Sequence, residues 1–163
     1  MRTTVRTHPV ARPADRRSDG QALVEFALAV IPFLILLMGV IDLGRGIYTM
    51  NGTSEAARDI NRATIVHLTN SSGDLGLSPE TTAVIATQVG LIPGLTIDPT
   101  TDIECVDMYD NVVADDDCER GVDFIRVHVT AEFDPITPLV SAFGSHVFES
   151  TSRMQIPAPA FGS

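Results

Sequence analysis

Residues 20–45 read GQALVEFALAVIPFLILLMGVIDLGR, and this stretch decides the fold of the chain. Within residues 22–41 the only ionisable side chain is that of Glu25. A helix of twenty residues is about 30 Å long, which matches the hydrocarbon thickness of a bilayer. A secretory signal peptide has a shorter apolar core with a small-residue cleavage site after it, whereas Asp42 and Arg45 follow this one. The stretch therefore predicts a transmembrane span at 22–41 that stays attached to the chain.

Charge is distributed unevenly on the two sides of this span. Residues 1–19 hold five arginines and two acids, a balance of +3, and the other 144 residues hold six arginines and nineteen acids, a balance of −13. The positive-inside rule then places the N-terminal leader in the cytoplasm and the acidic body outside the membrane. The net charge of the 163-residue chain, −10, argues against a surface that binds nucleic-acid phosphates.

The pattern of the chain predicts four regions. Residues 1–20 form a basic cytoplasmic leader, and residues 21–68 form one long helix that includes the span. Residues 69–157 form a small extracytoplasmic module, and residues 158–163 form a disordered tail. Beyond the span, a helical stripe with spacings of four and three continues the helix; it consists of Leu43, Ile47, Met50, Ser54, Ala57, Asn61 and Thr64.

The module is expected to contain one helix and three strands. Ser78 is a predicted N-cap, with Pro79 at the first helical position and Gly90 closing the helix. Residues 95–106, 122–133 and 146–156 read as strands, with a helical turn at 139–143. The core face of the middle strand is predicted to be Ile125, Val127, Val129, Ala131 and Phe133. The predicted fold class is α+β: a long N-terminal transmembrane and amphipathic helix, then one helix and a three-stranded antiparallel sheet.

Cys105 and Cys118 both fall in the predicted external module. In an oxidising compartment such a pair predicts a disulfide, which would contribute about 3 kcal/mol in the chain-entropy model. Two reduced, buried thiols are the alternative.

Seven acids lie within residues 107–123, around the second cysteine. Their spacing matches no EF-hand, so the sequence predicts a solvated, mutually repelling loop. His8, His67, His128 and His146 lack paired metal-ligand spacing, and no nucleophile or phosphate-binding motif is present. We therefore predict no catalytic residue, no cofactor, no metal site and no small-molecule substrate, and hence no enzyme.

Glu25 is the residue that needs an explanation, because a carboxylate within a membrane span is costly. If the chain is cut after Gly20, the new amine of Gln21 is a cation that the Glu25 of a neighbouring copy can pair with. A Glu25 close enough to the interface to be solvated is the alternative.

Gly20 followed by Glu25 and Phe26 resembles a type IV prepilin signal in its Flp/Tad form, and the longer stretch is similar to the TadE-like family. The matching residues are Gly20, Gln21, Ala22, Val24, Glu25, Phe26, Ala27, Pro32, Gly39, Asp42, Gly44, Arg45, Tyr48, Ala56, Ala57 and Arg58. Residues 133–139 resemble the proline-containing turn of the family, and residues 150–154 resemble its last strand. Asp59-Ile60-Asn61-Arg62 departs from the family's Glu-Gly-Ala-Arg.

The resemblance implies a single-pass minor pilin or pseudopilin of a Tad/Flp tight-adherence system, acting in pilus assembly and cell adhesion. It implies cleavage between Gly20 and Gln21 by a prepilin peptidase. It also implies that Glu25 and the neighbouring Phe26 act in assembly, with the Glu25 carboxylate forming the charge pair. It also implies a helix motif made of Pro32, Asp42, Gly44, Arg45, Tyr48, Ala56, Ala57 and Arg58. The expected partners are membrane lipid, other pilin-like subunits and the assembly machinery. The alternative is a permanently anchored binding module whose acidic disulfide loop recognises a ligand or a surface.

Overall fold

The computed structural model describes residues 16–68, 78–142 and 144–158. Most of the predicted leader and nearly all of the predicted tail lie outside these residues, as does the beginning of the predicted module. The chain forms two compact units, Met1–Met38 and Gly39–Ser163. The described strands all belong to the second unit.

Helix α1 spans Arg16–Val66 and continues through Pro32. The single long helix predicted from the sequence is therefore present, but it begins before Gln21. Arginine, glutamine, alanine and leucine residues surround Gly20, and these strong helix formers offset the roughly 1 kcal/mol that a glycine costs in a helix. Gly20 thus lies inside a helical turn.

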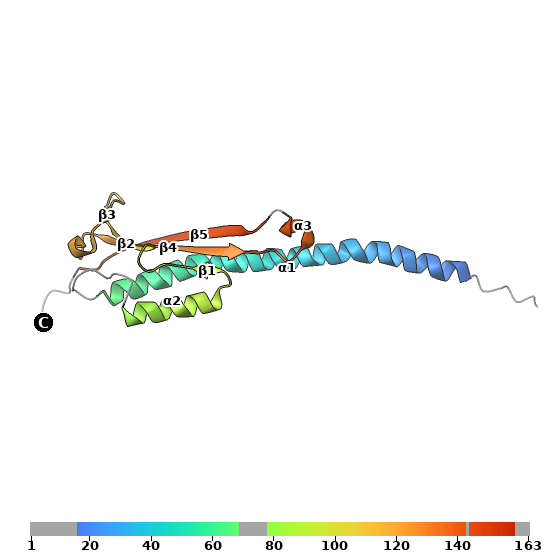
Figure 1. Cartoon of the computed structure of the whole chain (residues 1–163), viewed down its shortest axis with the longest axis horizontal. Helices are drawn as coiled ribbons and strands as arrows, with labels where there is room; N and C mark the ends of the chain where they lie inside the picture. Colours follow the sequence, from blue (N-terminus) through green and yellow to red (C-terminus); the bar gives the residue numbers. More distant parts are fainter. Residues whose placement is uncertain (1–15, 69–77, 143, 159–163) are drawn as a thin grey trace, which may run out of the picture. The chain divides into compact units, whose positions relative to one another are not determined.

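The second unit has an antiparallel sheet whose central strand is β4, Phe124–Phe133. On one side β4 pairs along its whole length with β5, His146–Gln155. On the other side it pairs with β1, Leu95–Thr96, and with β2, Ile103–Val106. A short strand β3, Val112–Val113, extends the sheet beside β2. The predicted α+β layout is confirmed (Figure 1).

The predicted strand at 95–106 is divided into β1 and β2, so the sheet has five strands and not three. A turn separates the two parts: the Asp98 carbonyl accepts the N–H of Asp102 at 2.8 Å. The Asp98 carboxylate accepts the Thr100 hydroxyl and N–H, which lowers the pKa of Asp98. Pro99 lies in this turn and has no N–H for a ladder. Alternation of side chains alone did not reveal this break.

Helix α2, Pro79–Leu91, begins where the sequence predicts. The Ser78 hydroxyl accepts the Thr81 N–H at 3.0 Å, as an N-cap does. Farther along the chain, α3, Pro138–Ser141, is a single short turn of helix.

The end of α2 differs from the prediction, because Gly90 lies inside the helix and Gly94 makes the reversal. Gly94 has φ +75°, and a Cβ there would lie 2.1 Å from the carbonyl oxygen of Glu132. The connection thus passes so close to β4 that only glycine fits.

The core lies between residues 39–66 of α1 and one face of the sheet (Figure 1). The predicted core face of β4 is confirmed, because its five residues are at most 8% exposed. The helix meets them mainly with small or polar side chains, and Ile60 is the large exception; the small or polar residues are Thr49, Thr53, Ala56, Ala57, Asn61 and Thr64.

The predicted helical stripe is only partly buried. Ala57, Asn61 and Thr64 face the core, whereas Leu43 and Met50 are more than half exposed. A spacing of 3.5 residues drifts by about 20° per heptad around a helix with 3.6 residues per turn. The N-terminal part of the stripe therefore turns away from the sheet.

Candidate functional site: the long helix and the turn that it binds

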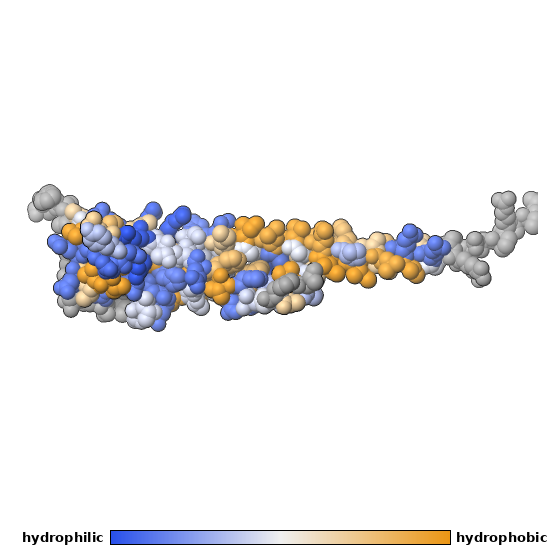
Figure 2. Space-filling view, turned by 90° about the horizontal axis from the view of Figure 1, so that it is seen from above, coloured by the Kyte–Doolittle hydropathy of each residue, from blue (hydrophilic) through white to orange (hydrophobic). Residues whose placement is uncertain are grey.

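The first unit presents an apolar helical surface. Starting at Gly20, α1 contains a segment long and apolar enough to cross a membrane, and none of this segment is buried. Large side chains are well exposed, for example Leu28 at 68% and Phe33 at 59%. Figure 2 shows hydrophobic residues gathered along this segment. The segment is consistent with a single membrane anchor, because an apolar surface of this extent is seldom left in water.

The predicted processing and pairing residues lie at the start of this segment. Gly20, Gln21, Glu25 and Phe26 are all exposed. No atom beyond the local helix lies within 4 Å of the position that a Cβ on Gly20 would occupy. The Glu25 carboxylate makes no hydrogen bond or ion pair with any other residue in the described parts of the chain. Within this chain, the described residues thus offer its carboxylate no cation.

Asp42 binds the turn that follows β4. Its side chain is buried, with Oδ1 accepting the Ile136 N–H at 3.1 Å and Oδ2 accepting the Thr137 N–H at 2.7 Å. The Arg45 guanidinium donates to Oδ1 at 3.2 Å. The Thr137 hydroxyl lies beside the carboxylate without a hydrogen bond of normal geometry. This hydroxyl, the two N–H groups and Arg45 together outweigh the effect of burial and lower the pKa of Asp42 to about 2.

Arg45, three residues after Asp42, extends the contact between α1 and the end of β4. Its guanidinium lies over the Phe133 ring, 5.3 Å from the centroid, in a cation–π arrangement. A Cβ on Gly46 would lie 3.8 Å from this ring. We call Asp42, Arg45, Phe133, Ile136 and Thr137 the junction cluster. It unites two segments that the sequence singled out separately, the helix motif and the proline-containing turn.

The other predicted motif residues take three different positions. The Tyr48 hydroxyl donates to the Leu91 carbonyl at 3.4 Å, at the end of α2. Ala56 and Ala57 are fully buried against the sheet. Gly44 and Arg58 are exposed, and Pro32 lies in the first unit. The structure therefore gives the motif residues from Asp42 onward mostly one task, which is to hold the module on α1.

Asn61 was not predicted to matter, yet it makes the most deeply buried polar contact of α1. Its Nδ2 donates to the Ile125 carbonyl at 3.0 Å and to the Ser152 carbonyl at 2.8 Å, so it bridges β4 and β5. Its Oδ1 has no hydrogen-bond partner among the described residues. The sequence placed Asn61 in the predicted helical stripe and at a departure from the pattern of the resembled family, which has alanine there, but neither signal indicated a contact with the strands.

The predicted disulfide is confirmed. Cys105 in β2 is joined to Cys118, with the two Cα atoms 6.1 Å apart, and Cys105 is fully buried. The bond connects the sheet to the segment that precedes β4. Since both thiols are used, this pair has no thiolate to offer a metal ion.

The expectation of a mutually repelling acidic loop is wrong for two of its members. The Asp110 carboxylate lies 3.0 Å from the Arg126 guanidinium and 3.9 Å from that of Arg153. Asp107 accepts the Asn111 side-chain amide and N–H, and these bonds lower its pKa. The loop is therefore tied to the solvent face of the sheet.

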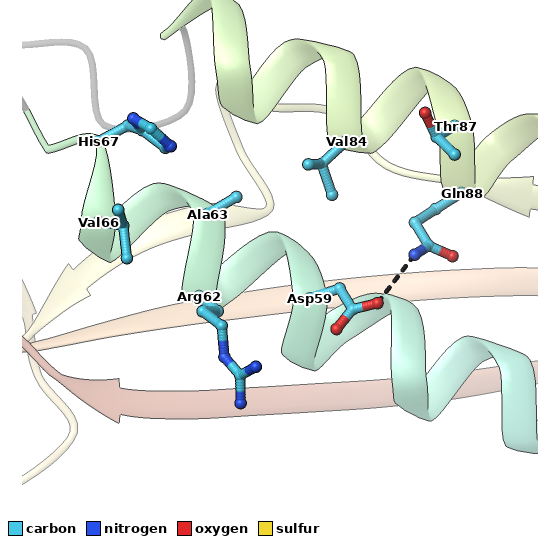
Figure 3. Close-up of a pocket in the computed structure, with 8 residues that line it drawn as sticks. All are labelled: Asp59, Arg62, Ala63, Val66, His67, Val84, Thr87 and Gln88. Atoms are coloured by element: carbon cyan, nitrogen blue, oxygen red, sulfur yellow. Dashed lines mark hydrogen bonds between the residues drawn. The ribbon is translucent and has the colours of Figure 1, made fainter.

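An open groove of about 410 Å³ lies between α1 and α2 (Figure 3). Its lining consists of Asp59, Arg62, Ala63, Val66, His67, Val84, Thr87 and Gln88. The Gln88 side-chain amide donates to Asp59 Oδ2 at 3.0 Å and joins the two helices. Figure 3 shows the Arg62 guanidinium directed away from that bond, so the polar groups do not converge on one point. We assign no ligand to this groove.

Comparison with known proteins adds one match. The family model described as TadE-like protein matches residues 20–62. No curated protein and no solved structure matches the chain. The matched segment begins at Gly20 and includes the exposed apolar helix, the helix half of the junction cluster and Asn61. Residues 20–62 of this chain belong to the TadE-like family.

Proposed function

We propose that the chain is a minor pilin or pseudopilin of a Tad/Flp-type pilus system. Its role is structural, in pilus assembly and adhesion, and it carries out no reaction of its own. One observation carries the proposal: a single helix, α1, contains both the exposed apolar segment and the residues that hold the module. The family match extends over both parts of this helix, and family membership supports association with Tad pilus machinery.

In this proposal the chain crosses the cell membrane once, at residues 22–41. The leader, residues 1–20, lies in the cytoplasm, because its arginines favour that side. The module at 69–157 and the remainder of the long helix lie outside. The disulfide supports this orientation, since disulfides persist in oxidising compartments.

A prepilin peptidase removes the leader by cleaving after Gly20. The new amine of Gln21 then pairs with the Glu25 carboxylate of an adjacent subunit, beside Phe26. Two features support this step: the exposure of Gly20, and the absence of a cation for Glu25 among the described residues. Pairing between subunits would favour helices that lie in register within lipid, where an unpaired charge is costly.

Cleavage is tested by the intact mass of the membrane-extracted chain after co-production with the cognate prepilin peptidase. The first 20 residues should be lost, which leaves 163 − 20 = 143 residues. Gly20→Val should block cleavage, because a branched side chain crowds the peptide bond. Gly44→Val, at another exposed glycine of α1, should be cleaved normally. A chain that still begins at Met1 in the presence of the peptidase would contradict the proposal.

Charge pairing is tested by Glu25→Gln, which keeps the shape of the side chain and removes its charge. Filaments should be lost while membrane insertion stays normal. Glu55→Gln, at an exposed carboxylate of the same helix, should leave filaments intact. The alternative, a permanently anchored binding module, predicts unchanged filaments in Glu25→Gln and loss of surface binding when residues 106–117 are deleted.

A further inference from the structure

Strand β5 forms an edge of the sheet. It pairs with β4 over ten consecutive positions without a bulge, from Gln155↔Phe124 to His146↔Phe133. No other strand in the described parts of the chain pairs with it. Within the described parts of the chain, one long side of β5 is therefore left without hydrogen-bond partners.

The backbone groups on this open side belong to alternate residues. The Ile156 N–H donates to the Asp123 carbonyl on the β4 side, at 3.0 Å, whereas the His128 N–H of β4 points away from β5, to the Asp102 carbonyl. Even-numbered residues of β5 thus face β4, and odd-numbered ones face outward. The outward residues are Val147, Glu149, Thr151, Arg153 and Gln155. Their backbone groups make no hydrogen bond with the rest of the described chain.

This edge lacks most of the usual protection against pairing. Natural edge strands are commonly short, bulged, or protected by proline or charged side chains. β5 has ten residues in unbroken register and contains no proline, and its charged side chains are those of Glu149 and Arg153. Its Arg153 leans back over the sheet, 4.0 Å from the centroid of the Phe124 ring, and does not cover the open side.

Another copy of this chain does not fit the edge well. In the second unit α1 runs parallel to β5, since Ser54 contacts Ser150 and Asn61 contacts Ser152. An antiparallel pair of β5 strands would therefore point the two α1 helices in opposite directions, which subunits anchored in one membrane cannot adopt. This step, and the naming of the partner below as another subunit of the assembly, rest on the proposed function.

The remaining ways to pair two copies are also unfavourable. A parallel pair through the same open edge requires one copy to be turned over about the strand axis, so the helix face of one sheet would continue the solvent face of the other. The opposite margin of the sheet offers β1 and β3, each only two residues long. Neither matches the length of β5.

We propose that β5 accepts an extended strand from a different subunit of the assembly, which joins the sheet antiparallel to β5. Backbone hydrogen bonds to the odd-numbered residues supply affinity, as in other cases of β-strand addition. On the helix side, the half-buried Phe148 and Met154 select apolar residues. On the solvent side, a basic residue belongs opposite Glu149 and an acidic residue opposite Arg153.

The test fuses the nine-residue strand TVEVTVKIT to the C-terminus of the full chain through a Gly/Ser linker. Tethering gives a millimolar effective concentration, so weak pairing is still detected. Amide hydrogen exchange in detergent micelles is the measurement. In the unfused chain, odd-numbered amides of β5 should exchange fast and even-numbered ones slowly. In the fusion, exchange at Glu149, Thr151 and Arg153 should slow at least tenfold.

Two variants make the result specific to this edge. Thr151→Pro removes the central outward N–H without touching the β4 ladder, and it should abolish the added protection, whereas Thr151→Val should keep it. Because the proline variant can affect folding, Glu149→Lys is a second test. It should weaken protection by TVEVTVKIT several-fold and strengthen protection by the charge-reversed strand TVKVTVEIT.

Three outcomes would overturn the proposal. Odd-numbered amides that are already protected in the dilute, unfused chain would show that the chain covers its own edge. Protection that appears only as concentration rises would show self-pairing. No added protection in the fusion would show that the edge does not accept a strand. None of these measurements depends on cleavage after Gly20 or on filaments, so the proposed function is judged separately.

Discussion

The Asp42 carboxylate accepts the Thr137 backbone N–H at 2.7 Å, although the two residues are 95 positions apart in the chain. A second bond from Ile136 and the Arg45 guanidinium hold the same carboxylate. Asp42 therefore attaches the turn after β4 to α1, close to the start of the second unit. The family segment contributes the acceptor and the Arg45 donor, and the turn after β4 contributes the two backbone donors.

Replacing Asp42 should change how stability depends on pH. The pKa of this carboxyl falls from its ordinary 3.8 to about 2, so its contribution is present above about pH 4 and is lost as the pH falls towards 2. Thermal unfolding of the full chain in detergent, from pH 2 to pH 6, measures this. Asp42→Asn should lower Tm at pH 6 and flatten the acid limb of the curve.

Glu55→Gln is the control for this prediction, because Glu55 is an exposed carboxylate of the same helix. Its Tm curve should follow that of the unmodified chain. An acid limb in Asp42→Asn as steep as that of the unmodified chain would show that the bonds to the turn contribute nothing.

Two glycines near the end of α2 should respond to alanine in opposite directions. Gly94→Ala should lower the free energy of unfolding by at least about 2 kcal/mol, because φ is +75° and the new Cβ meets the Glu132 carbonyl. Gly90→Ala should raise it by roughly 0.5–1 kcal/mol, since Gly90 is helical with open space around it. Denaturant titration of both variants measures the change in the free energy of unfolding. Equal changes would argue against the close approach of Gly94 to the Glu132 carbonyl.

Asn61 should be more tolerant of truncation than of a negative charge. Asn61→Ala removes two donated hydrogen bonds and should cost about 1–2 kcal/mol. Asn61→Asp has the same shape but turns a carboxylate towards the carbonyl oxygens of Ile125 and Ser152, so it should cost more than about 3 kcal/mol. The free energy of unfolding of the two variants is the readout. If Asn61→Asp were the milder change, the side chain would not lie between the two strands.

Loss of the disulfide should destabilise the second unit without changing its fold. The loop between Cys105 and Cys118 spans 13 positions, for which the chain-entropy model gives about 3 kcal/mol. The double variant Cys105→Ser, Cys118→Ser should show this loss in denaturant titration and should keep the amide protection of β4. The unmodified chain treated with a reductant serves as the comparison, and a stability unaffected by both changes would argue against a bonded pair.

The elements that the sequence predicted best are those with strong local signals. The unbroken apolar run of α1, the alternation along β4 and the Ser78–Pro79 helix start each depend on neighbouring residues only. The family resemblance over residues 20–58 of α1 was carried by a motif of the same local kind, and the match at residues 20–62 agrees with it.

The features that sequence reasoning missed depend on distant partners. The turn at Asp98 divides a strand whose side chains alternate well, and the closing glycine of α2 is set by the Glu132 carbonyl on another strand. Polar residues on the buried face of α1 argue against a core position when the sequence is considered alone. In the structure they are accommodated because Asn61 donates to two strand carbonyls and the Thr53 hydroxyl donates to the Thr49 carbonyl at 2.7 Å. Asp42 and Arg45 are opposite charges three positions apart, so a contact between them could be expected from the sequence. Nothing local shows that Phe133 and Thr137 complete the cluster.

The position of the junction cluster has a mechanical consequence. Since α1 is one helix, tension applied along residues 20–38 is transmitted through the backbone to residue 39 and then reaches Asp42 early in the second unit. The Asp42 bonds to the turn and the Arg45–Phe133 stack lie on adjacent helical turns, so they share that load before it arrives at Asn61. If the chain were pulled out of a bilayer by its helix, the junction cluster would be the first contact between α1 and the rest of the second unit to bear the force.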